Sequence, residues 1–367
     1  MQSHHLGSAC IAMALALTGC GGGSGGAGEG VASAPPPPSA PLVFPPPLTI
    51  PTTKNFDTAE YRQSRTAINS NAIGAWQHGA SGLGVKIGFV DTGLNPALSE
   101  FSGRIDPASK DVAGSRSMGD SWGHGTAVAS IAAGARDDSG MQGVAFDASI
   151  VMMRADDPGS CPSNCSFGSG AVAAGIDAAR LAGARVINLS IGGSEAASAI
   201  EDAVRRATNA GIIVVIGAGN DGNANPTGLA RELAAISPGR VIIVGALGIG
   251  SLPSVNYDQM VTYSNLAGLS ISSYLTAPGF LVRVAYGEGS YDIVSGTSFA
   301  APVVAGAVAL LAQAFPSLSA GSALAVDIVR KSSTPRGDAN VTLVARLLDC
   351  SHTRRSGRIH SDRGRVL

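Results

Sequence analysis

Three polar residues of this sequence could together supply a nucleophile, a base and a group that orients the base. Asp91 directly follows the apolar run "KIGFV", His124 lies in "GHGTAVAS" and Ser298 lies in "GTSFAAP". A serine hydroxyl becomes a nucleophile when a base takes its proton, and the base needs a third group to orient it. The sequence therefore predicts that Asp91, His124 and Ser298 form a catalytic triad.

The candidate base is found by elimination among six histidines. Four of them belong to the terminal segments: His4, His5, His352 and His360. Within the predicted globular body, His78 lies in the turn-like stretch "AWQHGASGLG", whereas His124 is flanked by Gly123 and Gly125, which allow a backbone or a substrate to approach closely. His124 is therefore the candidate general base, and a structural histidine at a helix start is the alternative.

Ser298 opens a long apolar stretch, 297–315, that is typical of a helix. Serine is a preferred N-cap, so a capping role is the alternative to catalysis. Two features favour the nucleophile. A helix N-terminus carries partial positive charge where an oxyanion would develop. Pro302 lacks the N–H that would have bonded to the carbonyl of Ser298, a defect that costs about 3 kcal/mol in an ordinary helix interior.

These residues require a scaffold that brings distant segments together. Short continuous apolar runs, typical of strands buried on both faces, occur at 85–90, 149–155, 185–190, 212–217 and 241–247. Helix-like segments occur at 124–134, 170–182, 195–210 and 297–315. This alternation predicts an α/β fold with a mostly parallel central sheet and helices on both faces. Such sheets place their sites at the carboxyl ends of strands, where Asp91 falls.

The composition excludes some functions. Hydrophobic residues make up 45% of 367 residues, which is enough for a large core. The formal net charge of −1 gives no sign of the basic face that a nucleic-acid-binding protein needs. No apolar run is expected to reach the ~18 residues of a membrane-spanning helix.

The segments "VDTG", "GHGTAVAS" and "GTSFAAP", in this order, resemble the signatures of subtilisin-like serine proteases. The resemblance covers roughly residues 75–330 and implies a subtilisin-like three-layer fold and serine endopeptidase activity. It implies that His124 deprotonates Ser298 while Asp91 orients His124. "GAGNDG" resembles the segment that carries the family's oxyanion-hole asparagine, which falls on Asn220.

The substrate-binding residues also follow from the resemblance. "NLSIGG" (188–193) resembles the substrate-binding strand, which implies that Ser190 and Gly192 bond to the peptide backbone and form a wall of the specificity pocket. Small residues at 190–193 and 217–219, Gly217 among them, predict a roomy, apolar pocket.

The N-terminal segment has the features of a targeting signal. Residues 1–19 contain a short apolar region, and "LTGC" resembles a bacterial lipobox, which implies that Cys20 carries a lipid. An ordinary secretion signal is the alternative. Gly21 follows the cysteine, a pattern that implies the outer membrane. Residues 20–55 are Gly- and Pro-rich and predict a linker.

Two cysteines lie close together in "GSCPSNCSFGSG". In an exported protein, Cys161 and Cys165 are expected to form a small-loop disulfide. No cofactor is expected. Asp137 and Asp138 could form at most a weak calcium site, and a solvated turn fits them better, so calcium has no recognisable site.

The sequence thus predicts an exported, lipid-anchored serine endopeptidase with its protease domain at 56–348 and a basic, disordered tail at 349–367. With the lipobox and spacer, "EFSGRI" and "GVAFDASIV" resemble lipoprotein autotransporter-type subtilases of Gram-negative bacteria. The expected location is the outer membrane, at its periplasmic face or at the cell surface. Expected partners are protein or peptide substrates and the membrane, not nucleic acid, and a monomer is expected. The alternatives are a catalytically silent subtilisin-fold adhesion or binding protein and a truncated autotransporter passenger.

Overall fold

The computed structural model describes residues 54–161, 165–248, 259–287 and 290–316 and the two short strands 334–335 and 342–343. They belong to one compact unit, Leu48–Leu367. The predictions for the signal peptide, Cys20, the linker up to residue 53 and the basic tail lie outside the described residues.

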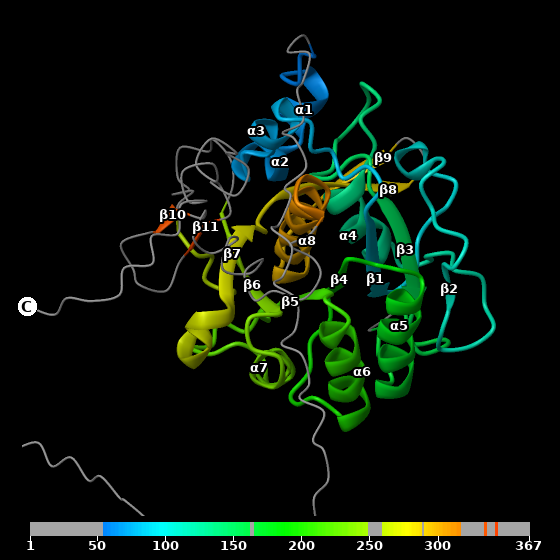
Figure 1. Cartoon of the computed structure of the whole chain (residues 1–367), viewed down its shortest axis with the longest axis vertical. Coiled ribbons are helices and arrows are strands. Elements are labelled where there is room, and N and C mark those ends of the chain that lie inside the picture. Colours follow the sequence, from blue (N-terminus) through cyan, green and yellow to red (C-terminus); the bar gives the residue numbers. More distant parts are fainter. Residues whose placement is uncertain are drawn as a thin grey trace, which may run out of the picture. The chain divides into compact units, whose positions relative to one another are not determined.

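A nine-stranded sheet forms the centre of the described part, in the order β10-β11-β7-β6-β5-β4-β1-β3-β2 (Figure 1). The strands are β1 Lys86–Asp91, β2 Lys110–Asp111, β3 Ser149–Arg154, β4 Val186–Leu189, β5 Ile213–Gly217, β6 Val241–Leu247, β7 Tyr274–Pro278, β10 Thr334–Pro335 and β11 Thr342–Leu343. Neighbouring strands are parallel except for the β10–β11 pair. The predicted mostly parallel sheet is confirmed.

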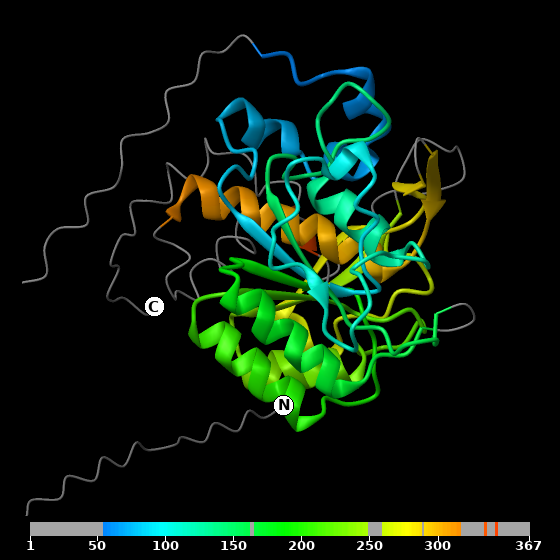
Figure 2. The same cartoon turned by 90° about the vertical axis from the view of Figure 1, so that its right-hand side faces the viewer.

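Helices cover both faces of the sheet (Figure 2). One face carries α5 Ser169–Leu181, α6 Ser198–Asn209 and α7 Gly228–Ile236, and the other carries α4 His124–Ala133 and α8 Thr297–Ala314. Successive strand residues point to opposite faces, so Phe89 belongs to the α4/α8 core and Val90 to the α5–α7 core. Both faces are buried, which explains why the strands are continuous apolar runs.

Helix α8 has 18 residues and a mean hydropathy of 1.6, so by length and composition it matches a membrane span. The expectation that no apolar run reaches this length is therefore wrong. However, the helix is mostly buried and packs against α4 and strands β4 to β7. It is a core helix of the domain.

The remaining elements are short and were not predicted. They are α1 Ala59–Gln63, α2 Arg65–Asn69, α3 Ala72–Gln77, η1 Ser99–Phe101, η2 Gly268–Ser273 and the antiparallel hairpin β8 Val282–Gly287 with β9 Ser290–Val294. Helix α7 was missed too, although Thr227 caps it by accepting the N–H of Ala230 at 3.4 Å. The helices among these elements have three to nine residues, which give too few turns for a clear helical period.

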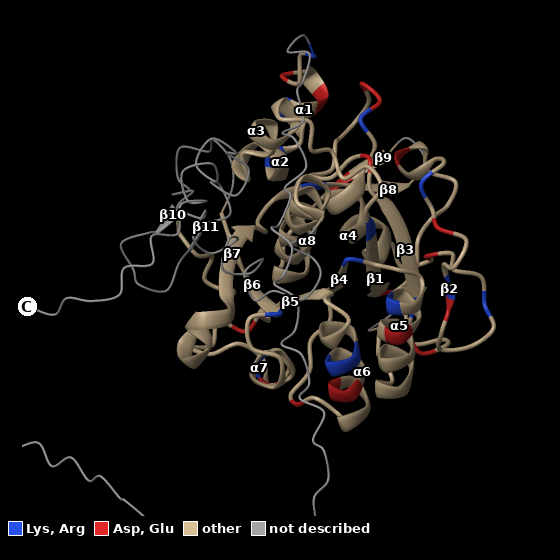
Figure 3. Ribbon diagram, viewed as in Figure 1, with Lys and Arg blue, Asp and Glu red and all other residues tan. Residues whose placement is uncertain are grey.

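Charged residues of both signs are interspersed along the described part of the chain (Figure 3). On α5 and α6 they pair across the helices, because Arg206 donates to Asp177 at 2.6 Å. The predicted disulfide is present between Cys161 and Cys165.

Candidate active site

The carboxyl end of β1 and the start of α4 bring Asp91 and His124 together. The Nδ1 atom of His124 contacts Oδ1 of Asp91 at 2.7 Å. Asp91 is fully buried, whereas 22% of the His124 side chain is exposed. The same Oδ1 accepts the backbone N–H of Thr92 at 2.8 Å. With Nδ1 directed at the carboxylate, Nε2 is the imidazole nitrogen left for a second partner.

Glycines allow this contact, as the sequence predicts. A Cβ at Gly125 would lie 2.3 Å from the carbonyl oxygen of Gly93 and 3.1 Å from Cβ of Asp91. Only glycine therefore lets the first turn of α4 lie directly on the end of β1. Gly123, the N-cap, has φ 90°, a left-handed conformation that glycine adopts without strain.

The surroundings of His124 favour its charged form. Burial alone lowers the pKa of the imidazole, but the charge and hydrogen bond of Asp91, together with the charge of Asp120, outweigh it. The net effect raises the pKa of His124 above its ordinary 6.5. The site is thus built to stabilise an imidazolium.

Ser298 is the second residue of α8, and it exchanges hydrogen bonds with Ser190 just beyond the end of β4. The hydroxyl of Ser190 donates to the carbonyl oxygen of Ser298 at 2.7 Å, and the hydroxyl of Ser298 donates to the carbonyl oxygen of Ser190 at 3.4 Å. The first bond replaces the helical bond that Pro302 cannot make. The proline therefore leaves a carbonyl free to join the start of α8 to the sheet.

Phe299 links the two halves of the site. Its ring lies against the His124 imidazole, with the ring centroids 5.4 Å apart, and it directly follows Ser298. Helices α4 and α8 also pack against one another. The first turns of the two helices thus converge at the edge of the sheet where β1 ends.

Asn220 follows β5 and faces the start of α8. Its side-chain oxygen accepts the backbone N–H of Thr297 at 2.8 Å. The Nδ2 atom lies 3.6 Å from where a Cβ of Gly296 would be. With the oxygen engaged by the helix N-terminus, the NH₂ group near Gly296 is left as a donor.

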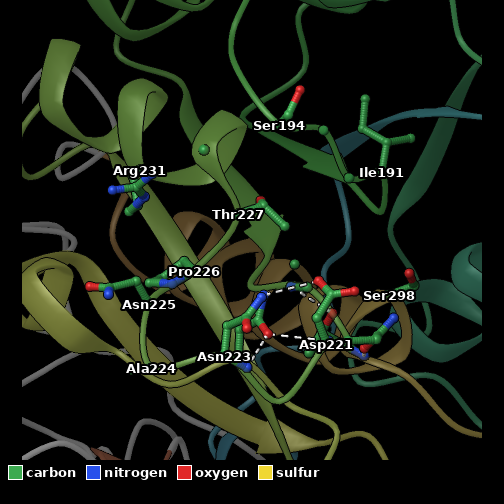
Figure 4. A pocket seen from close by; sticks show the side chains of 18 residues that line it. Ile191, Ser194, Asp221, Asn223, Ala224, Asn225, Pro226, Thr227, Arg231 and Ser298 are labelled. Carbon is green, nitrogen blue, oxygen red and sulfur yellow. Dashed lines mark hydrogen bonds between the residues drawn. The ribbon is translucent and has the colours of Figure 1, made fainter.

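A pocket of about 720 Å³ lies next to Ser298 (Figure 4). Gly192 and Gly217 are among the residues that line it. Its lining is mainly polar, however, and includes the following side chains that the sequence analysis missed: Ser194, Asp221, Asn223, Asn225, Thr227 and Arg231. The expectation of an apolar pocket is therefore wrong, because the polar loop "DGNANPTG" and the first turn of α7 form much of its wall. That loop directly follows Asn220 and was the available signal.

The turn at Asp137 and Asp138 is held by protein groups. Their backbone N–H groups donate to the two carboxylate oxygens of the buried Glu60, at 3.1 and 3.3 Å. Within the described ranges, no three His, Cys, Asp or Glu side chains gather in a way that could hold a metal ion.

A buried carboxylate in contact with an imidazole at the end of one parallel strand, together with a serine at a nearby helix N-terminus, is the combination of groups expected of a serine hydrolase. The chain belongs to the subtilase family, whose model matches residues 82–342. It is accordingly a serine peptidase, and its substrates are proteins.

Individual relatives agree with this family. Subtilisin DY of Bacillus licheniformis is 33% identical over 245 residues, which cover 66% of this chain and 81% of that protein. Thermitase of Thermoactinomyces vulgaris is 34% identical over 238 residues, covering 64% and 76%. The crystal structure of a cold adapted subtilisin-like serine proteinase superposes with a TM-score of 0.59 at 28% identity, covering 73% of this chain and 90% of that chain.

Proposed function

We propose that this peptidase cleaves proteins through a triad of Ser298, His124 and Asp91, with an acyl-enzyme intermediate. One observation carries the proposal: Nδ1 of His124 lies 2.7 Å from a carboxylate that is fully buried. This contact fixes the tautomer in which Nε2 is free to accept a proton. The serine on the adjoining helix N-terminus is the group that the free nitrogen would serve.

In the proposed mechanism, Nε2 of His124 takes the proton of Ser298 Oγ, and Oγ attacks the scissile carbonyl carbon. The oxyanion accepts hydrogen bonds from the amide of Asn220 and the backbone N–H of Ser298. His124 then gives its proton to the leaving amine, and the C–N bond breaks. A water molecule, deprotonated by His124, attacks the acyl-enzyme, and Ser298 recovers its proton as the carboxylic acid product leaves.

Substrate binding follows the same geometry. The pocket beside Ser298 would receive the side chain on the acyl side of the cleaved bond. The segment that includes Gly192 would bond to the peptide backbone, while Ser190 holds the start of α8. The specificity pocket is open and polar, so it fits polar residues better than large aromatic ones.

A fluorophosphonate probe tests the triad directly, because it reacts only with an activated serine. The wild-type protein should be labelled at Ser298 and should hydrolyse casein, and Ser298→Ala should do neither. A folded wild-type protein that resists the probe would refute the catalytic proposal and favour a silent binding protein of the same fold.

Export and lipid anchoring complete the proposal. The lipobox-like "LTGC" and the Gly- and Pro-rich linker support a lipid on Cys20 that tethers the protease at the outer membrane, as in lipoprotein autotransporter-type subtilases. A relative from Thermus sp., 35% identical over 247 residues, is named an extracellular serine proteinase, which supports export. Radiolabelled palmitate should label the wild type and a Cys350→Ala control but not Cys20→Ala. Equal labelling of all three would contradict the assignment.

A further inference from the structure

Asp120 lies four residues before His124, at the centre of a hydrogen-bond cluster around the first turn of α4. Its Oδ1 accepts the hydroxyl of Thr92 at 3.0 Å and the backbone N–H groups of Trp122 and Gly123 at 3.2 and 2.8 Å. Its Oδ2 accepts the backbone N–H and the hydroxyl of Thr126 at 2.8 and 2.7 Å. All five partners are donors, so only a carboxylate satisfies them all.

Both hydroxyl groups in this cluster are fixed in direction. Thr92 Oγ1 accepts the backbone N–H of Gly125 at 2.9 Å, and Thr126 Oγ1 accepts that of Asn95 at 3.0 Å. Each hydroxyl must then give its proton to Asp120. The carboxylate therefore joins the turn after β1 to the first turn of α4, the two segments that carry Asp91 and His124.

The charge of Asp120 acts on the same imidazole. It is one of the groups that raise the pKa of His124, after Asp91. Other charged or titratable groups near this edge include Arg154 at the end of β3, which pairs with Asp156 at 2.8 Å, and Tyr286 of β8, whose ring lies against Gly123. Arg116 also pairs with Asp156, at 2.8 Å, and with Asp111. With Arg154 occupied by Asp156, the two carboxylates Asp91 and Asp120 dominate the field at His124.

We propose that Asp120 is a positioning residue of the triad: it holds the first turn of α4 so that His124 stays on Asp91, and its charge helps to stabilise the imidazolium. The inference rests on the proposed function but assigns a part that the triad alone does not contain. It makes the base side of the site a two-carboxylate arrangement, in which one carboxylate touches the imidazole and the other fixes its helix.

Two substitutions separate the geometric from the electrostatic part. Asp120→Asn places an NH₂ group against donors and removes the charge. We expect kcat to fall by about 10- to 100-fold with KM nearly unchanged, and the acidic limb of the kcat/KM profile to move to lower pH. Thr92→Val removes both the hydrogen bond to Asp120 and the one from Gly125 but keeps the charge of Asp120, so kcat should fall while the acidic limb stays close to its wild-type pH. Thr92→Ser keeps the hydroxyl and should behave like wild type.

An exposed carboxylate provides the matched control, since Asp202→Asn on α6 should leave kcat and the pH profile unchanged. Circular dichroism and a thermal melt show whether each variant is folded. If Asp120→Asn does not fold, the proposal is tested by comparing kcat of Thr92→Val with that of Thr92→Ser. Folded variants with wild-type kcat and an unmoved acidic limb would overturn the role of Asp120. Failure of the proposed function differs, because then the wild type itself would not react with the fluorophosphonate.

Discussion

The two halves of the candidate site are built in different ways. On the base side, Asp91 is fully buried and Asp120 half-buried, and the hydrogen bonds they accept fix His124 and its helix. On the nucleophile side, backbone groups and short side chains hold Ser298, and the structure opens into a pocket of about 720 Å³.

The difference follows from what each half must do. A base that becomes charged during the reaction needs permanent negative charge and one fixed tautomer, which carboxylates in a confined setting provide. A nucleophile needs space for a substrate that brings its own hydrogen-bonding groups. Substitutions on the base side should therefore change the pH profile, whereas those on the nucleophile side should change the rate at every pH.

The largest effect is expected for Ser298→Ala. Turnover of a peptide substrate should fall by about a million-fold, because no other group can form the acyl-enzyme. The melting temperature should stay close to wild type, since the hydroxyl makes one long bond to Ser190 at 3.4 Å. An exposed Ser102→Ala variant serves as control. Substantial turnover in folded Ser298→Ala would place the nucleophile elsewhere.

Asp91→Asn should cost about ten-thousand-fold in kcat, because the amide can no longer fix the productive tautomer of His124. The acidic limb of the remaining activity should also move to lower pH, as the charge that favours the imidazolium is lost. Steady-state kinetics across pH checks both. A fall in rate without a displaced limb would mean that Asp91 acts through geometry alone.

Asn220→Ala should lower kcat by about 100- to 1,000-fold, because one oxyanion donor is removed. Asn220→Asp is the informative partner, since it keeps an acceptor for the N–H of Thr297 but puts negative charge where the oxyanion forms. Both variants should lose rate at all pH values, and the uncharged Asn220→Ala should keep the wild-type position of the acidic limb. If Asn220→Asp were as active as wild type, Asn220 would only cap α8.

Glu100 is a buried carboxylate outside the site, and it shows whether hydrogen bonds offset the burial of a carboxylate there as they do at Asp91 and Asp120. Burial raises its pKa to about 7, even though Oε1 accepts the Tyr291 hydroxyl at 2.9 Å, and within the described residues Oε2 is buried without a hydrogen-bond partner. The folded protein therefore holds the proton of Glu100 more tightly than the unfolded chain does. This proton stabilises the fold fully below pH ~4.5, and its contribution is lost as the pH rises through about 7.

Glu100→Gln should remove this pH dependence. Relative to wild type, the free energy of unfolding should increase by roughly 2 to 3 kcal/mol between pH 5 and pH 8. Urea unfolding at pH 5 and pH 8 measures it, with the exposed Glu195→Gln as control. Parallel pH curves for Glu100→Gln and wild type would show that Glu100 stays ionised in the fold.

The smallest change is the pH dependence of the wild-type enzyme. His124 must be neutral to act as base, and its pKa is raised, so kcat/KM should fall below a midpoint that lies above pH 6.5. The stability of the fold depends on pH in the opposite direction. Protonated His124 stabilises the fold fully below pH 6.5, and this contribution is lost as the pH rises through the raised pKa. A midpoint below 6.5 would contradict the field assigned to Asp91 and Asp120.

Much of the fold could be predicted because its signals are local. The strands that contain "KIGFV" and "VIIVGAL" are apolar over almost their whole length, and α4 and α8 each follow a clear turn. The observed ends of these four elements therefore lie within a residue or two of the predicted ends. Helix α7 and the β8–β9 hairpin were missed, because short elements are stabilised mainly by tertiary packing. The polar pocket was missed because the small residues of two strand ends were weighed without the loop between Asn220 and Thr227.

By itself, the sequence determined the residue types and their order: Asp91 after a strand, and His124 and Ser298 each at the start of a helix. These features depend on local periodicity and on the chemistry of single side chains. Only the tertiary structure decided that Ser190 takes the carbonyl freed by Pro302 and that the hydroxyl of Thr92, from the turn after β1, donates to Asp120. Such contacts join residues far apart in the chain, and their distances depend on how the whole sheet and its loops pack.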